Sequence, residues 1–152
     1  MLRIALPFVA MAALATVSCG NRAAAPEDYG TRIVTLPNGK TIRCEVMIHP
    51  QDMMRGMMFR DSLPAGRGML FIHGEPGNYT YWMYQVKIPL DIIWMDQHRR
   101  IVEISANTPP CEKGPASSCP QYGGKEKAQF VLELAAGAVK EYGLKVGDVL
   151  DF

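Results

Sequence analysis

The sequence has no excess of charge of either sign. Its 152 residues include 16 Lys and Arg against 15 Asp and Glu, a formal net charge of +1. Residues 1–18 contain a single charged residue, Arg3, so the rest of the chain is neutral. A protein that binds nucleic acid through its phosphates needs a basic field. We therefore expect no nucleic-acid partner.

The sequence also lacks an apolar run of the roughly 20 residues that a membrane-spanning helix needs. Its first residues are Met-Leu-Arg, followed by an apolar stretch over residues 4–17 and then by Ser18-Cys19-Gly20. One positive charge, a short apolar region and small residues at a cleavage point are typical of a secretory signal peptide. We predict that residues 1–18 are such a signal and that the protein is secreted across the inner membrane into the periplasm.

Two cleavage points are compatible with this segment. Val17-Ser18-Cys19 resembles the bacterial lipoprotein box, in which Cys19 would carry the lipid and anchor the protein to the membrane. Thr16 departs from that box, which usually has an aliphatic residue at this position, and cleavage after Ala23-Ala24-Ala25 would release a soluble protein. We predict the lipoprotein, with residues 19–30, which are mostly small and polar, as a flexible tether.

Residues 31–152 alternate short strand-like runs with turns and have no internal repeat, which suits a single domain. Asn38-Gly39 between two such runs is the strongest short-range hairpin signal. Pro50 is placed to open one short helix that Gly56 would end, and a second is predicted over residues 135–142. Seven or more short strands with one or two small helices predict a mainly β fold, either a β-sandwich or a partly closed barrel.

Four ordered blocks of sequence carry a family resemblance. They are Arg-Gly-Met-Met-Phe-Arg at residues 55–60, Gly-Met-Leu-Phe at 68–71, Trp-Met at 82–83 with Ile-Pro-Leu-Asp-Ile-Ile at 88–93, and Val-Leu-Glu-Leu at 131–134 with Gly137. Over residues 40–152 the chain resembles the DUF192 family, a domain of unknown function. The resemblance implies a secreted or envelope-associated, jelly-roll-like β-sandwich without assigned activity. Where the family usually continues Trp-Met with Lys-Asn-Thr, this chain has Tyr84-Gln85-Val86.

Asp91 and Glu133 place carboxylates inside apolar strand patterns. A buried carboxylate is costly unless it is paired or hydrogen-bonded. We predict that Arg55 and Arg60 complete a buried structural network with the two carboxylates. The alternative is a small hydrolase in which Asp91 and Glu133 act as general acid and base. Because no nucleophile, metal or phosphate motif accompanies the pair, we expect a domain that binds rather than catalyses.

The four cysteines divide by context. Cys111 and Cys119 lie beside prolines in a long loop, and in an oxidising compartment this spacing favours a disulfide. A zinc site would need a short Cys-x-x-Cys pair or a nearby histidine, which the loop lacks. Cys44 falls on the apolar side of its strand and is predicted to be a buried, inert thiol. The histidines, His49, His73 and His98, form no recognisable catalytic motif with a cysteine or serine.

Ten methionines are many for this length, and four of them cluster at helical spacing: Met53, Met54, Met57 and Met58. Thioethers are soft ligands, so a periplasmic Cu(I)-binding protein is a second alternative. Methionine also fills irregular cores. We expect the core role, and no cofactor.

Aromatic residues crowd the stretch that precedes Asp91, and four of them are candidate ligand contacts: Tyr79, Tyr81, Trp82 and Tyr84. Strand alternation would send Tyr79 and Tyr81 to one face and Trp82 and Tyr84 to the other, one face being core. Aromatic faces stack on sugar rings or anchor partner proteins. We therefore predict an envelope-associated binding domain whose ligand is a glycan or a partner protein.

Overall fold

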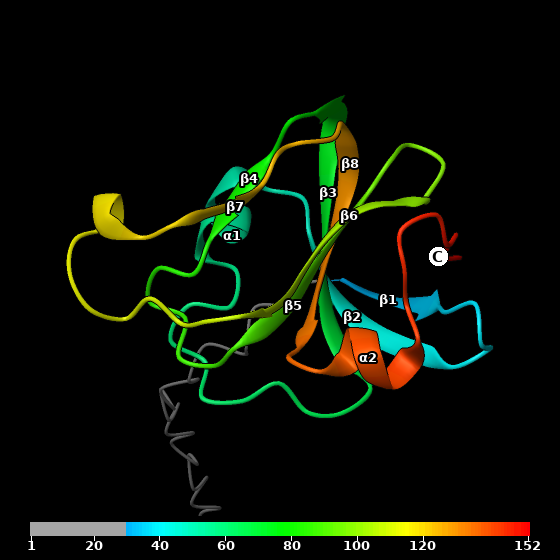
Figure 1. The fold of residues 1–152 in the computed structure, drawn as a ribbon, viewed down its shortest axis with the longest axis horizontal. Coiled ribbons are helices and arrows are strands. Elements are labelled where there is room, and N and C mark those ends of the chain that lie inside the picture. The colour runs from blue at the N-terminus through cyan, green and yellow to red at the C-terminus, as the bar shows by residue number, and fades with distance from the viewer. Residues whose placement is uncertain (1–29) are drawn as a thin grey trace, which may run out of the picture.

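The computed structural model describes residues 30–152. The predicted signal peptide, Cys19 and all of the predicted tether except Gly30 lie outside the described residues. The described chain is mainly β, with two short helices, as predicted (Figure 1). In chain order its elements are β1 (Thr31–Thr35), β2 (Thr41–Met47), α1 (Pro50–Arg55), β3 (Arg67–Gly77), β4 (Thr80–Trp82), β5 (Leu90–Met95), β6 (Ile101–Thr108), the 3-10 turn η1 (Ala116–Ser118), β7 (Gln121–Gly123), β8 (Ala128–Ala135) and α2 (Ala138–Tyr142).

The strands form one large open sheet and one small sheet. The large sheet has the order β1-β2-β3-β8-β5-β6, and β4 pairs with β7 in the small one. All strand pairs are antiparallel except β2 with β3. Because β1 and β6 end the large sheet without pairing to each other, the sheet is not a closed barrel, and with the small second sheet the architecture is sandwich-like.

The predicted hairpin and helices are present. The side chain of Asn38 accepts a hydrogen bond from the Lys40 amide at 3.0 Å and closes the turn between β1 and β2. Pro50 opens α1 and Gly56 ends it with a φ of 41°. Helix α2 begins three residues later than predicted, because Ala135 is still paired in β8 and Gly137 turns the chain with a φ of 91°.

The large sheet has a separate apolar core on each face. On one face, Ile93 and Leu132 pack with Leu70 and with residues of α2. On the other, Trp94 and Val131 pack with Phe71 and with residues of α1 and of the small sheet. Figure 1 shows α1, β4 and β7 gathered at one side of the large sheet and α2 at the other. Strands covered on both faces read as continuous apolar runs, and all six residues of β5 are buried.

The predicted disulfide joins Cys111 to Cys119. Cys111 also pairs through its backbone with the segment that follows β4: its amide donates to the Met83 carbonyl at 3.1 Å, and its carbonyl accepts from the Gln85 amide at 3.1 Å. The disulfide therefore restrains a loop that packs beside the aromatic segment.

Replacing Cys111 and Cys119 together by Ser is expected to lower the free energy of unfolding by about 2 kcal/mol, because the unfolded chain regains the entropy of a short closed loop. Urea denaturation measures the change. Reductant should reproduce the loss in the wild type and should have no effect on the double variant, since Cys44 is free. A free thiol at either loop position in the oxidised protein, detected by mass spectrometry after alkylation, would contradict the disulfide.

Candidate functional site

A pocket with a volume of about 350 Å³ opens on the side of the large sheet that carries α1. One wall is α1 with the turn that follows it, the opposite wall is the aromatic segment from Tyr79 to Val86, and the floor is formed by β3 and β8. Its lining is mostly apolar; the residues are Pro50, Met53, Met54, Arg55, Gly56, Met57, Met58, Phe71, His73, Tyr79, Thr80, Tyr81, Trp82, Tyr84, Val86 and Glu133.

The methionine wall follows from the short helix. With only six residues in α1, the side chains around it diverge: Met57 is buried in the core, Met53 packs against that core, and Met54 is 68% exposed. Gly56 brings the end of the helix against Phe71, since a Cβ there would lie 3.3 Å from the ring. All four clustered methionines line the pocket, so the core role predicted for them holds fully only for Met57.

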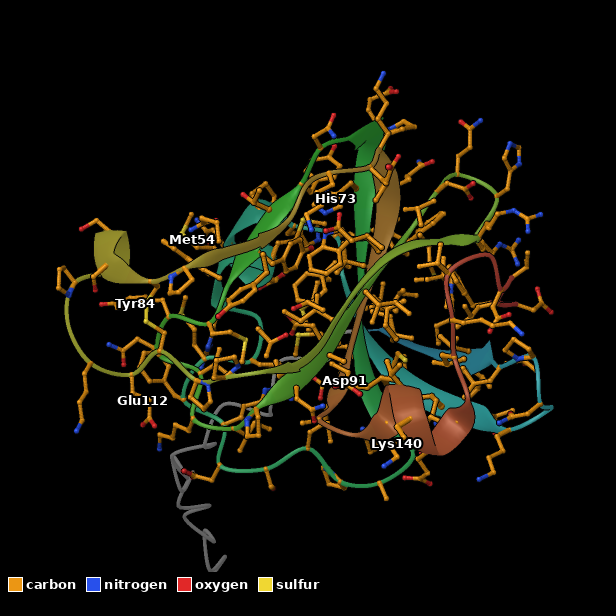
Figure 2. All side chains as sticks on the ribbon, in the orientation of Figure 1. Met54, His73, Tyr84, Asp91, Glu112 and Lys140 are labelled. Atoms are coloured by element: carbon orange, nitrogen blue, oxygen red, sulfur yellow. A yellow bond between two sulfur atoms is a disulfide. The ribbon has the colours of Figure 1, made fainter. Side chains whose placement is uncertain are left out.

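The aromatic wall departs from simple alternation. Because β4 is only three residues long and ends at Trp82, the chain turns, and Tyr79, Tyr81, Trp82 and Tyr84 are all half-buried and all line the pocket. Neither pair is fully buried, so the prediction that one of the two faces is core does not hold for these four side chains. The rings of Trp82 and Tyr84 lie 5.6 Å apart and are tilted by 50°. Figure 2 shows Tyr84, Met54 and His73 on the same side of the large sheet.

Tyr81 and His73 form a polar pair within this apolar lining. The Tyr81 hydroxyl lies 3.1 Å from His73 Nε2, and the ring of Tyr81 packs edge-on against Phe71 with centroids 5.1 Å apart. Tyr79 stacks on the His73 ring at 3.5 Å and donates its hydroxyl hydrogen to the Glu75 carbonyl at 2.6 Å. Burial lowers the pKa of His73, so the imidazole is neutral at pH 7.

Glu133 projects from β8 into the floor of the pocket. The residue is 4% exposed, and its Oε2 has no hydrogen-bond partner among residues 30–152. Burial raises the pKa of Glu133 to about 8, while the charge of Arg60 opposes that shift. The pKa of Tyr81 is raised first by burial and then by the charge of Glu133. The carboxyl of Glu133 is therefore mostly protonated at pH 7, which leaves the floor of the pocket without net charge.

Asp91 lies on the opposite face of the sheet from Glu133. In the pairing of β5 with β8, Ile92 is opposite Glu133 and Asp91 is opposite Leu134. Successive residues of a strand point to opposite faces, so the sheet separates the two carboxylates. The predicted four-residue network and the hydrolase pair of Asp91 with Glu133 are both wrong.

Backbone amides, not arginines, satisfy Asp91. Its Oδ1 accepts from the Asn107 amide and its Oδ2 from the Val139 amide, both at 2.7 Å. The Asn107 amide is available because the pairing of β5 with β6 slips opposite Asp91, between Leu90 and Ile92. The Val139 amide belongs to the first turn of α2, where amides have no partner within the helix. Asp91 thereby connects the irregular pairing of β5 with β6 to the first turn of α2.

The predicted arginine fork exists, but on another carboxylate. Arg60 binds both oxygens of Glu45 at 2.7 Å, and these hydrogen bonds lower the pKa of Glu45. The charge of Arg60 also opposes the raised pKa of Glu133, and Arg55 lies in the lining of the pocket. The two arginines are thus near Glu133 but remote from the partners of Asp91.

The remaining candidates have different outcomes. Cys44 is free and buried, and burial raises the pKa of its thiol to about 12, as expected for an inert residue. Within the described residues, no group of three or more His, Cys, Asp or Glu could hold a metal ion. Methionine is not among these four residue types, so copper binding at Met53, Met54, Met57 and Met58 stays a prediction.

Sequence reasoning missed His73 and Phe71 as pocket residues. Both lie on β3, two positions apart, and the same alternation places Met69 on their face. That spacing could have assigned His73 to the face of β3 that it shares with Phe71. It could not show that α1, which packs over this face, leaves a pocket there.

The fold and the pocket define a small, open β-sandwich with one aromatic cavity over one of its two cores. The chain belongs to the DUF192 family, described as an uncharacterized ACR, whose model matches residues 33–152.

Two solved structures are similar to the chain, each with 30% sequence identity and a TM-score of 0.72. One, from Sinorhizobium meliloti 1021, is described as a candidate transcription regulator; the match covers 81% of this chain and 94% of that one. The other, from Novosphingobium aromaticivorans DSM 12444, is described as a protein of unknown function, with 80% and 85% covered. No match was found among curated proteins. Neither described helix has the length and apolarity needed to cross a membrane.

Proposed function

We propose that this protein is a lipid-anchored binding domain of the bacterial envelope that holds a small, mostly apolar ligand in the pocket between α1 and the aromatic segment. The observation that carries the proposal is the pocket itself: a concave, largely apolar lining with a few polar atoms converging at its floor. That combination is typical of small-molecule sites.

Binding accounts for the pocket better than hydrolysis does. Of the two carboxylates that the hydrolase alternative requires, only Glu133 reaches the cavity. The other titratable groups at the floor, His73 and Tyr81, are both held toward their neutral forms by burial. The arrangement offers hydrogen bonds and contact area rather than an acid and base pair.

The shape of the site refines the ligand class. A glycan would use the faces of Tyr79 or Tyr84 as a stacking platform, and it would need more polar atoms around each sugar hydroxyl than this lining supplies. A ligand with an aliphatic or aromatic body fits the methionine and aromatic walls better. The envelope location rests on the signal-like N-terminus, and the disulfide supports it because an oxidising compartment preserves such bonds. The neutral charge of the chain gives no support to a nucleic-acid ligand.

A ligand screen by thermal shift, including aromatic amines and acids, muropeptides, oligosaccharides and metal ions, tests this proposal. For a hit, Met54→Trp is expected to weaken binding by about tenfold or more, because an indole at this exposed position fills the mouth of the pocket. Val146→Trp is the matched control: Val146 is 59% exposed and lies outside the lining, so its affinity should match the wild type. Hits that bind both variants equally, or no hit at all, would contradict the proposed site.

A further inference from the structure

The floor of the pocket holds a carboxyl group that the protein itself does not satisfy. Glu133 Oε2 is buried and has no hydrogen-bond partner within residues 30–152. The guanidinium of Arg60, whose charge opposes the raised pKa of Glu133, donates from both of its terminal nitrogens to Glu45. Buried polar atoms in folded proteins nearly always have partners, so an unpaired oxygen on a residue that lines a cavity indicates a place for a hydrogen-bond donor or a cation from outside the protein.

The walls around this carboxyl consist mostly of apolar, polarisable side chains, aromatic on one side and methionine on the other. Phe71, Tyr79, Tyr81, Trp82 and Tyr84 contribute aromatic rings, and the opposite wall contributes polarisable methionine sulfurs. The ring planes of Trp82 and Tyr84 are tilted by 50° relative to each other, so the two rings do not stack. Aromatic rings carry a negative face and attract organic cations, most strongly where water is excluded.

From these two features we propose that the pocket recognises an organic ammonium group, with the nitrogen beside the Glu133 carboxylate and its alkyl groups against the aromatic rings. The inference rests on the proposed function and names the chemical class of its ligand. A carboxylate at the base of an aromatic enclosure satisfies a cation in two ways at once, through charge and through the ring faces.

The other charged and titratable groups around Glu133 are compatible with a cation. Tyr81 and His73 are neutral, and Arg60 has its charge compensated by Glu45. Arg55, in the same lining, lies at the end of α1 and is exposed, so solvent screens its charge. An anionic group would have to approach the Glu133 carboxyl directly, whereas an ammonium ion would replace the proton that the carboxyl holds in the empty pocket.

That exchange gives the proposal a pH signature. The ammonium ion binds the ionised carboxylate, and with the pKa of Glu133 near 8 the ionised fraction rises about tenfold between pH 7 and pH 9. A neutral ligand that accepts a hydrogen bond from the protonated carboxyl would show the opposite trend. The direction of the pH dependence therefore separates the two kinds of ligand.

The experiment compares choline with 3,3-dimethylbutan-1-ol, its neutral analogue with carbon in place of nitrogen, by calorimetry or NMR titration at pH 7 and pH 9. The wild type is expected to bind choline about tenfold more tightly at pH 9 than at pH 7, and at least about tenfold more tightly than the analogue at pH 9. Glu133→Gln, which keeps the shape but not the charge, should abolish the pH dependence and reduce the preference for choline to the part that the ring faces supply, and Met54→Trp should weaken both compounds.

Three results would overturn the inference: equal affinity for choline and the analogue, a pH dependence of choline binding that persists in Glu133→Gln, or no binding of choline at either pH. If the analogue binds as well as choline and Met54→Trp blocks it, the small-molecule pocket stands and only the ammonium group is excluded. If no compound of the wider screen binds either, the proposed function fails with it. Melting curves of Glu133→Gln recorded alongside show that any loss comes from the folded protein.

Discussion

Replacing Asp91 by Ala is expected to lower the free energy of unfolding by about 4 kcal/mol. The substitution removes the acceptor of two short hydrogen bonds and leaves the amides of Asn107 and Val139 without that partner. Each hydrogen bond to a charged group is worth roughly 1.5 to 3 kcal/mol, so the loss of two such bonds accounts for a change of about 4 kcal/mol. For a domain of this size the melting temperature should fall by more than about 10 °C. Urea denaturation and calorimetry measure both quantities.

Two further variants sharpen the interpretation. Asp91→Asn keeps one acceptor oxygen but turns an NH₂ group toward the second amide, so its loss should be smaller, about 2 to 3 kcal/mol. Asp151→Ala is the matched control, because Asp151 is exposed and its pair with Arg99 is worth less than about 1 kcal/mol. Ligand affinity should be unchanged in Asp91→Asn, since Asp91 lies on the other face from the pocket. A loss in Asp91→Ala no larger than in Asp151→Ala would refute the role given to Asp91.

Glu133 should make the protein less stable as the pH rises, the reverse of the usual effect of a carboxylate. In the unfolded chain the group ionises near pH 4.5, but in the folded protein it keeps its proton up to about pH 8. The stability is fully present below pH 4.5 and is lost progressively as the pH rises toward 8. By pH 8 this burial costs the wild type on the order of 4 kcal/mol, of which about 1.5 kcal/mol falls between pH 6.5 and pH 8.

Glu133→Gln is expected to remove that slope. Urea denaturation at pH 6.5 and pH 8 should show the variant gaining about 1.5 kcal/mol relative to the wild type over this interval. The window lies above the titration of the two groups whose pKa is lowered in the folded protein. The lowered pKa of His73 acts below about pH 6.5, and that of Glu45 acts below about pH 4.5. Glu126→Gln, at an exposed position, is the control and should keep the slope of the wild type. Equal slopes in Glu133→Gln and the wild type would show that Glu133 is ionised in the folded state.

Local signals predicted the elements that depend on local physics. Three such features were predicted from the residues that form them: the Asn38-Gly39 turn, the short helix between Pro50 and Gly56, and the disulfide of Cys111 with Cys119. Alternation also placed Cys44 in a core. These features follow from backbone preferences and from short loop closure, which neighbouring residues decide.

The composition of the candidate site was predicted in part. The aromatic segment and the methionine cluster were both identified as candidate contacts, but strand alternation did not predict that Tyr79, Tyr81, Trp82 and Tyr84 all line one pocket, because β4 ends at Trp82, before Tyr84. The partners of Asp91 could not be predicted. They come from a bulge 16 residues away and a helix start 48 residues away, and neither carries a charge that a sequence pattern would match to a carboxylate.

The sequence by itself determined that this is a mainly β domain of the DUF192 family with a buried carboxylate on each of two strands. The tertiary structure alone decided what each carboxylate does. The sheet order inserts β8 between β3 and β5, which sets Glu133 on the face of Phe71 and His73, under α1, and leaves Asp91 on the face covered by α2. Strand order depends on how segments distant in the chain pack together to bury the two apolar cores. These long-range contacts cannot be recognised from the sequence of β5 or of β8 alone.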